Sequence, residues 1–225
     1  MSTLYAIPTP LGGKAADALP AAALEIVRSL RDFAVENEKT ARAFLKDVGM
    51  AVSMRDLNVS ENLLGFLEVL RGGTPVGLLS EAGCPAIADP GALLVEAAQR
   101  EGIRVVPLIG PSSVVLALMA SGLEGQRFSF CGYLPREADE RKRRIQALET
   151  RSRKEHETQI FIETPYRNDA MLAALLEQCS PKTRLCLASD LTLGTESIRT
   201  RSVQDWRASR PVIGKRPTIF LLLSR

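Results

Sequence analysis

Histidine and paired cysteines are scarce in this sequence of 225 residues. The four cysteines, Cys84, Cys131, Cys179 and Cys186, form no Cys-x-x-Cys motif, and His156 is the one histidine. Zinc sites need several closely spaced thiolates or imidazoles, so the sequence predicts no metal site. A Ser-His-Asp or Cys-His catalytic group also needs a well-placed histidine, which argues against hydrolysis by such a group.

Aromatic residues and long apolar runs are scarce as well. Aromatic residues make up 5% of the chain, too few to favour a surface on which nucleic-acid bases stack. No apolar run approaches the roughly 18 to 20 residues that cross a membrane, and no signal-peptide pattern opens the sequence. We therefore expect a cytoplasmic protein. A hydrophobic content of 45% and a charged content of 24% indicate a globular α/β enzyme.

Charge is distributed unevenly between the two halves of the chain. Residues 1–110 carry 10 basic and 13 acidic side chains, a net charge of −3. Residues 111–225 carry 19 basic and 13 acidic side chains, a net charge of +6. This asymmetry favours an anionic partner for the second half, with solvated surface as the alternative interpretation.

In the first half, short apolar runs alternate with helical patterns, which is typical of βαβ units and a parallel sheet. We expect five strands, at 4–8, 33–36, 51–54, 75–80 and 103–108. Helices are expected between them, near 20–30, 38–47, 60–71 and 91–101. These elements predict a first α/β domain, residues 1–110, with a parallel five-stranded sheet.

The second half is less regular. Strands are expected at 128–133, 159–163, 184–189, 196–202 and 218–223. Two of them lie close together without a helix between them, which indicates a mixed sheet. Pro111 is suited to the first position of a helix because its missing N–H has no partner there. We predict a second α/β domain, residues 111–225, and a ligand cleft between the two domains.

Three loops that follow strands are rich in proline and small residues. Residues 8–13 read Pro-Thr-Pro-Leu-Gly-Gly and match neither the dinucleotide-binding nor the P-loop signature. Residues 80–91 read Ser-Glu-Ala-Gly-Cys-Pro-Ala-Ile-Ala-Asp-Pro-Gly, and residues 107–113 read Pro-Leu-Ile-Gly-Pro-Ser-Ser. Open α/β sheets bind ligands at such strand ends. Glu81 at the strand tip is a functional candidate, whereas we expect Asp89 to cap the helix that starts at Pro90.

In this order and spacing, the three loops resemble those of the tetrapyrrole methylase family. Further motifs extend the likeness over nearly the whole chain: 128–135 (Phe-Ser-Phe-Cys-Gly-Tyr-Leu-Pro), 161–167 (Phe-Ile-Glu-Thr-Pro-Tyr-Arg) and 187–192 (Leu-Ala-Ser-Asp-Leu-Thr). Each motif is weak alone, but six in register are specific. Within the family, the likeness is greatest to members that methylate a cytidine 2′-hydroxyl in 16S ribosomal RNA.

The resemblance implies a homodimeric, two-domain methyltransferase that binds S-adenosylmethionine in the cleft between its domains. The family's contacts to this cofactor come from the loops at strand ends. Carried over motif by motif, they fall on Pro10, Gly12, Ser80, Glu81, Ala82, Gly83, Pro111, Ser112, Glu163, Thr164, Leu191, Thr192, Pro217 and Thr218.

The loop after the second strand departs from the pattern of the RNA-modifying members. They carry Glu-Asp-Thr-Arg there, whereas residues 36–42 of this chain read Glu-Asn-Glu-Lys-Thr-Ala-Arg. Glu36 matches, and we interpret it as the base that accepts the proton of a hydroxyl nucleophile, with Asn37 as a hydrogen-bonding orienter. An ion pair from Glu36 to Lys39 or Arg42 is the alternative. The altered loop also leaves open a small-molecule substrate such as a tetrapyrrole, or a cofactor-binding protein without activity.

A basic run, Arg141, Lys142, Arg143 and Arg144, lies in the stretch 136–157, which holds eight basic and six acidic residues. Mixed charges of this kind predict an exposed helix. Four adjacent cations can neutralise several phosphates, so these residues are candidate contacts to RNA. Solvated surface is the equally consistent alternative.

Overall fold

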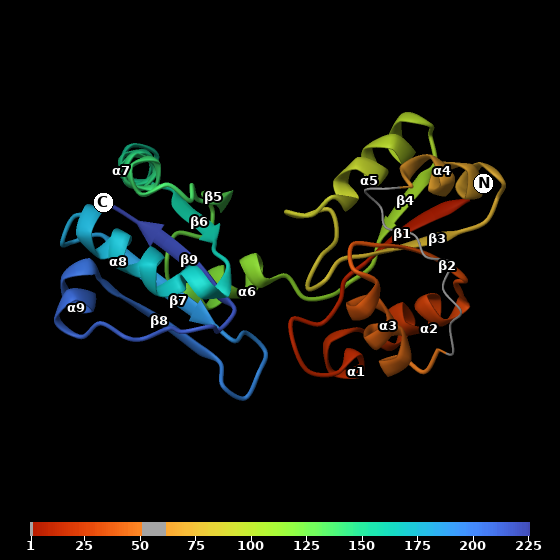
Figure 1. Ribbon diagram of the computed structural model, residues 1–225, viewed down its shortest axis with the longest axis horizontal. Helices are drawn as coiled ribbons and strands as arrows, with labels where there is room; N and C mark the ends of the chain where they lie inside the picture. Colours follow the sequence, from red (N-terminus) through yellow and green to blue (C-terminus); the bar gives the residue numbers. More distant parts are fainter. Residues whose placement is uncertain (1, 51–61) are drawn as a thin grey trace. The chain divides into compact units, whose positions relative to one another are not determined.

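The chain folds into two compact units, Met1–Ser112 and Ser113–Arg225 (Figure 1). The computed structural model describes residues 2–50 and 62–225. In chain order, the first unit contains β1 (Thr3–Ile7), α1 (Ala15–Ala18), α2 (Ala21–Ser29), β2 (Asp32–Val35), α3 (Glu38–Asp47), α4 (Leu63–Arg71), β3 (Val76–Leu79), α5 (Gly91–Arg100) and β4 (Arg104–Pro107). The strand expected at 51–54 lies outside the described residues.

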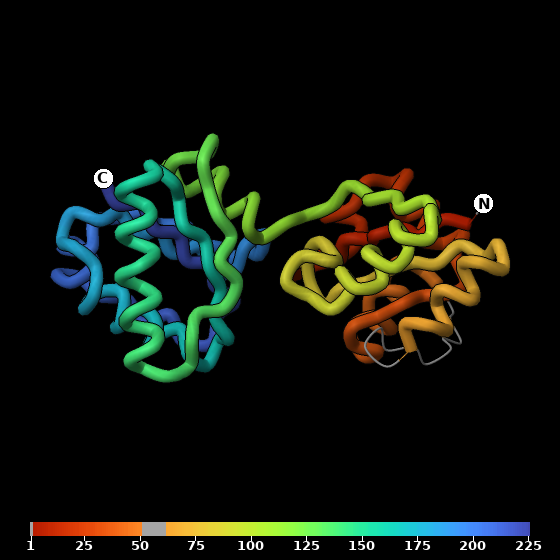
Figure 2. Tube along the Cα trace, turned by 90° about the horizontal axis from the view of Figure 1, so that it is seen from above, coloured from red at the N-terminus to blue at the C-terminus, as the bar shows by residue number. Residues whose placement is uncertain are grey.

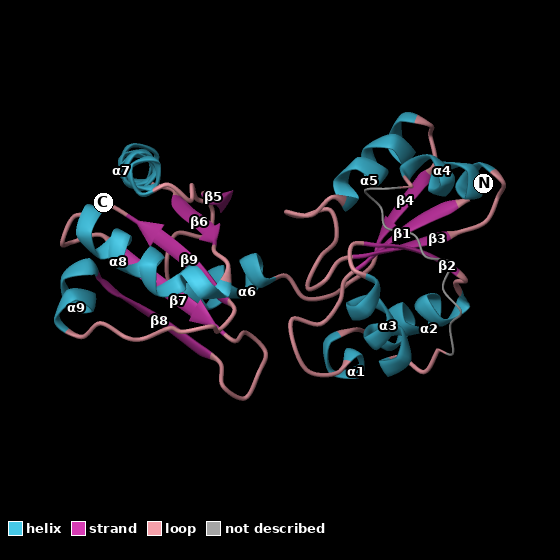
Figure 3. Cartoon of the chain, in the orientation of Figure 1, coloured by secondary structure: helices cyan, strands magenta, loops and turns pink. Residues whose placement is uncertain are grey.

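The strands of the first unit form one parallel sheet in the order β2-β3-β1-β4. Helices α1 to α3 cover one face and α4 and α5 cover the other (Figure 1). Side chains alternate between the faces along a strand, so Phe33 and Val35 pack with the first set while Ala34 packs with the second. All four strands end at the same edge, and the long loops after β1, β3 and β4 leave from it (Figure 3).

The second unit has one long surface helix and a larger sheet. Its elements are α6 (Ser113–Ser121), β5 (Phe128–Tyr133), α7 (Ala138–Glu155), β6 (Thr158–Ile162), η1 (Pro165–Arg167), α8 (Asn168–Gln178), β7 (Arg184–Ser189), β8 (Ser197–Ser202), α9 (Val203–Ala208) and β9 (Thr218–Leu223). The strand order is β5-β6-β9-β7-β8, with β5 and β6 parallel and the other pairs antiparallel.

Alternating side chains divide the core of the second unit between the two faces of its sheet. Phe161, Phe220 and Leu222 pack with α7, α8 and α9, and the rings of Phe161 and Phe220 stack at 5.7 Å between centroids. Ile160 and Leu221 have the opposite parity and face the side that α6 covers. Helix α7 runs along one face of this sheet (Figure 2), where it packs on β6 and β9. Its Arg151 reaches β5, where Nη2 donates to the Ser129 hydroxyl at 2.9 Å.

The predicted α/β fold class, with a parallel sheet followed by a mixed sheet, is confirmed. The prediction that Pro111 opens a helix is wrong, because α6 begins at Ser113. Pro111 instead lies in the loop after β4, where its carbonyl accepts a hydrogen bond from the Cys84 thiol. The short helix α1 was not predicted, since four residues are too few to show a helical period.

Candidate functional site

The loops after β1 and β3 are joined by a two-residue bridge. The backbone N–H of Thr9 donates to the Gly83 carbonyl at 2.9 Å, and the Gly83 N–H donates to the Thr9 carbonyl at 3.0 Å. The Thr9 hydroxyl also donates to the Ser80 carbonyl at 3.3 Å. Two of the loops that carry candidate cofactor contacts therefore form one backbone surface at the edge of the sheet.

Gly83 allows the loop after β4 to approach this surface. Its φ is +80°, a backbone conformation that residues other than glycine rarely adopt. A Cβ on Gly83 would lie 3.3 Å from Leu11 Cδ2 and 3.6 Å from the Pro111 carbonyl oxygen. Small residues and main-chain groups from three loops thus meet around Gly83.

Glu36 reaches the same edge from the loop after β2. Its Oε2 accepts a hydrogen bond from the Glu81 N–H at 3.3 Å, and its own N–H donates to the Leu79 carbonyl at 3.4 Å. Burial raises the pKa of Glu36 above its ordinary value of 4.5, and the carboxylates of Asp89 and Glu81 add to this, while the Glu81 N–H opposes it. A carboxyl group with a raised pKa is suited to accept a proton near neutral pH.

Asp89 binds main-chain groups at the start of α5 with one oxygen and turns the other inward. Its Oδ1 accepts from the N–H groups of Ala86 at 2.9 Å and Gly91 at 2.8 Å. The predicted helix start is wrong by one residue, because α5 begins at Gly91 and Pro90 is its N-cap. Its Oδ2 is buried without a hydrogen-bond partner in the part of the chain that the structure describes. Burial raises the pKa of Asp89. Ala86 and Ala88 both have positive φ, so strain is concentrated in this loop, as it often is at functional sites.

Asn37 serves as the N-cap of α3. Its side-chain oxygen accepts from the N–H groups of Lys39 at 3.0 Å and Thr40 at 3.3 Å. Arg42 forms an i,i+4 ion pair with Glu38 at 3.2 Å. Asn37 and Arg42 thus stabilise α3. The Glu36 side chain instead contacts the loop after β3.

In the second unit, Glu163 and Thr164 follow β6. The Glu163 side chain is almost fully buried, and its Oε1 accepts from the Thr164 N–H at 2.8 Å. Its Oε2 lies 2.9 Å from the Arg167 guanidinium, an ion pair without the alignment of a hydrogen bond. A buried carboxylate therefore fixes the backbone conformation just after β6.

The turn after β7 is locked to the turn before β9. Asp190 accepts from Arg216 Nε at 2.6 Å, and its N–H donates to the Pro217 carbonyl at 2.9 Å. The Ser189 and Thr218 hydroxyls lie 2.8 Å apart. Hydrogen bonding to Arg216 lowers the pKa of Asp190, so it is ionised at neutral pH. These contacts fix the backbone on both sides of Leu191, Thr192, Pro217 and Thr218.

Two further residues hold this turn and were missed by the sequence analysis. Asn168 Nδ2 donates to the carbonyls of Gly214 at 3.2 Å and Arg216 at 2.8 Å. The Asp169 carboxylate accepts from the N–H groups of Ile213 at 2.8 Å and Gly214 at 3.1 Å. Both residues directly follow the motif at 161–167, but no local pattern marks them because their partners lie more than 40 positions away.

The loops around Gly83 offer groups that suit an organic cofactor. No group of three or more His, Cys, Asp or Glu side chains suited to a metal ion occurs in residues 2–50 and 62–225. The loops instead offer main-chain groups, hydroxyls and small side chains around Gly83, where a Cβ would intrude. Such surfaces are suited to a polar small molecule that the backbone approaches closely.

Residues 3–205 match the family model described as Tetrapyrrole (Corrin/Porphyrin) Methylases. The chain belongs to this family. A relative from Pseudomonas aeruginosa, named "Ribosomal RNA small subunit methyltransferase I", is 35% identical over 213 residues, which are 92% of this chain and 73% of the relative. A relative from Micromonospora olivasterospora with the same name is 39% identical over 176 residues, 77% of this chain and 54% of the relative.

Solved structures of tetrapyrrole methylase fold agree with the observed architecture. A crystal structure of diphthine synthase matches all of this chain and 90% of its own chain with a TM-score of 0.72 at 14% identity. This likeness shows the fold alone. The family membership confirms the methyltransferase assignment.

The basic run lies at the start of α7 and its members differ in environment. Arg141 is partly buried, and its Nη1 donates to the Arg136 carbonyl at 2.8 Å. Lys142, Arg143 and Arg144 are exposed. The predicted exposed helix is confirmed, and the run points in several directions around it rather than forming one patch. No helix of the described residues is long and apolar enough to span a membrane.

Proposed function

We propose that this chain is an S-adenosylmethionine-dependent methyltransferase that acts on the 2′-hydroxyl of a cytidine in 16S ribosomal RNA. The observation that carries the substrate is the shared name of the relatives, which are 33–39% identical over most of the chain. A cytoplasmic location and a homodimer belong to the same proposal, the former because ribosomal RNA is its substrate.

Glu36 accepts the proton of the nucleophile in this proposal. A ribose hydroxyl is weakly acidic, so a carboxylate at the reacting oxygen assists its attack. The hydrogen bond from Glu81 N–H to Glu36 Oε2 fixes the orientation of that carboxylate. When bound, S-adenosylmethionine supplies the methyl group. Asn37 acts through the conformation of the loop, because its side-chain oxygen caps α3.

Both units contribute to cofactor binding in this proposal. The first contributes Pro10, Gly12, Ser80, Glu81, Ala82, Gly83, Pro111 and Ser112, and the second contributes Glu163, Thr164, Leu191, Thr192, Pro217 and Thr218. The bridge at Gly83 and the Asp190–Arg216 contact support these sets, because each holds several of the residues in a fixed backbone arrangement. The exposed members of the basic run, with Arg141 beside them, contact RNA phosphates.

Methyl transfer from labelled S-adenosylmethionine tests the proposal against its alternatives. We expect label in the RNA of 30S particles and none in added tetrapyrroles. Label in a tetrapyrrole would assign a small-molecule substrate, and cofactor binding without transfer would indicate a protein without activity. Calorimetry with EDTA-treated protein gives a separate readout of the cofactor site. A dissociation constant of about 1 mM corresponds to a binding free energy near −4 kcal/mol. Absence of binding at that cofactor concentration would contradict the assignment of the cofactor site.

A further inference from the structure

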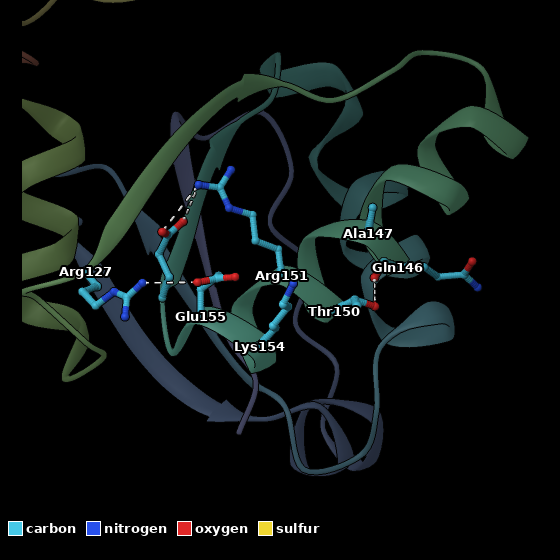
Figure 4. A pocket seen from close by; sticks show the side chains of 8 residues that line it. Arg127, Gln146, Ala147, Thr150, Arg151, Lys154 and Glu155 are labelled. Atoms are coloured by element: carbon cyan, nitrogen blue, oxygen red, sulfur yellow. Dashed lines mark hydrogen bonds and ion pairs between the residues drawn. The ribbon is translucent and has the colours of Figure 1, made fainter.

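A groove lies on the outer face of α7, at the edge of the second unit (Figure 4). It has a volume of about 770 Å³. The residues that line it are Arg127, Gln146, Ala147, Thr150, Arg151, Lys154, Glu155 and Glu157. Its walls come from α7, from the residue that precedes β5 and from the turn between α7 and β6. The groove uses none of the strand-end loops assigned to the cofactor.

Helical spacing gathers cations along this face. Arg144, Ala147, Arg151 and Lys154 follow one another at intervals of three or four residues, so they share one side of α7. The small side chain of Ala147 leaves space between the longer ones. Ile145 and Leu148 are buried on the opposite, core-facing side. Arg144 therefore lies on the same side of α7 as the lining residues, one turn toward the start of the helix.

The cations of this face lie near β5, because Arg151 Nη2 donates to the Ser129 hydroxyl at 2.9 Å. Burial raises the pKa of Cys131 on β5, and the charges of Arg144 and Arg151 both oppose this. Hydrogen bonding to Ser129 lowers the pKa of Glu157, with further lowering by Gln159, Arg151 and Arg127. Arg144, Arg151 and Arg127 thus act on the same short stretch of surface beside β5.

Two carboxylates orient the arginines without neutralising the groove. Arg127 Nη2 lies 3.4 Å from Glu155 Oε2, as Figure 4 shows, and Arg151 Nη2 lies 3.1 Å from Glu157 Oε1. Both arginine side chains remain more than half exposed, at 58% and 51%. Such exposed pairs contribute little stability. Three cations, Arg127, Arg151 and Lys154, thus line the groove beside two carboxylates, and Arg144 lies one turn beyond them on the same side of α7.

We infer that this groove, lined by the cations Arg127, Arg151 and Lys154 and continued by Arg144 one turn along α7, binds the backbone of the RNA substrate. The inference rests on the proposed function, since it takes RNA as the substrate, and it assigns the contact to one face of α7 rather than to the whole basic run. Phosphates match the four cations. Glu155, whose side chain is 40% exposed, can accept from the donors that RNA also carries, the ribose hydroxyls and the cytidine amino group.

The test compares two double variants that remove the same charge from the second unit. Arg144→Ala with Lys154→Ala removes two cations from this face of α7 and leaves both arginine ion pairs intact. Arg199→Ala with Lys182→Ala is the matched control. Arg199 is exposed on β8, and Lys182 is exposed in the turn before β7. The probe is a fluorescein-labelled single-stranded RNA of about 24 nucleotides that contains cytidine, titrated at several salt concentrations.

We expect the groove variant to bind this RNA about tenfold more weakly at moderate salt. Its log–log salt slope should fall by roughly 0.7 for each lost phosphate contact, whereas the control should keep the slope of the unmodified protein. Affinity for S-adenosylmethionine should be unchanged in both variants. Equal slopes in the groove variant and the control would overturn the inference. So would loss of polyglutamate binding without loss of RNA binding, which would indicate an acidic protein partner.

Methyl transfer to 30S particles separates this inference from the proposed function. If the unmodified protein transfers methyl groups to RNA and the two variants behave alike, the groove assignment fails and the function stands. If the unmodified protein neither binds nor methylates RNA, both fail. Single substitution of Lys154 by glutamate gives an independent check, since reversal of one charge in the groove should lower RNA affinity more than Lys182→Glu.

Discussion

The Glu36 carboxylate accepts a hydrogen bond from the backbone N–H of Glu81, with 3.3 Å between Oε2 and N. The two residues follow adjacent strands, β2 and β3, whose carboxyl ends meet at one edge of the parallel sheet. A backbone donor cannot be removed by mutation of Glu81, so the orientation of Glu36 depends on the loop rather than on one side chain. Substitution of the Glu36 side chain alone therefore tests its chemical role.

Replacement of Glu36 by glutamine should lower the rate of methyl transfer by about 10²-fold or more. Glutamine keeps the shape and an oxygen acceptor for the Glu81 N–H, but it cannot accept a proton. The measurement is single-turnover transfer at saturating S-adenosylmethionine, and cofactor affinity should not change. Glu38→Gln is the control, because Glu38 pairs with Arg42 on α3. Full activity in Glu36→Gln would leave proton removal to another group, with Glu81 the next candidate.

The rate should rise with pH through the raised pKa of Glu36. Below that pKa the carboxyl group is protonated and cannot accept a proton, so the acidic limb should lie above 4.5. Asp89→Asn removes one of the charges that raise this pKa and should move the limb to lower pH. Its Oδ1 contacts to Ala86 and Gly91 are available to asparagine.

Glu96→Gln on the exposed side of α5 is the control for the pH experiment, since it removes one negative charge away from Glu36. Its pH–rate profile should match that of the unmodified protein. An acidic limb that stays in place in Asp89→Asn would show that Asp89 does not act on the ionising group.

Gly83→Val should weaken S-adenosylmethionine binding by at least about tenfold. Valine is strained at a φ of +80°, and its side chain would enter the space between Leu11 and Pro111. Gly73→Val is the matched control, because Gly73 has a φ of +90° but nothing within 4 Å of an added Cβ. Calorimetry on both variants measures the effect. Equal weakening in the two would attribute it to general backbone strain.

Arg216→Lys should raise the KM for S-adenosylmethionine by roughly tenfold with a smaller change in kcat. Lysine cannot reproduce both the Nε bond to Asp190 and the Nη2 bond to the Thr195 carbonyl, each 2.6 Å long, so the turn before β9 should loosen. Arg199→Lys, at an exposed position of β8, should leave both constants unchanged. An equal KM for S-adenosylmethionine in the two variants would show that this turn does not contribute to cofactor binding.

The sequence by itself determined the elements whose signals are local. The helix expected at 38–47 is α3, and the strands expected at 128–133, 184–189 and 218–223 are β5, β7 and β9 with the same bounds. Short-range periodicity and turn residues specify these segments, because each buries one face or is bounded by residues that cannot continue it. The motifs that mark the methylase family are also short contiguous stretches, so they could be recognised without the fold.

Only the tertiary structure decided which of those loops act together. Glu36 and Glu81 are 45 positions apart, and Arg216 and Asp190 are 26 apart. Their contacts depend on strand order and on the backbone path at strand ends. The α7 groove depends likewise on Arg127, which comes from outside the helix. A chain can encode such pairings only through packing of the whole unit, because non-local contacts leave no period in the sequence.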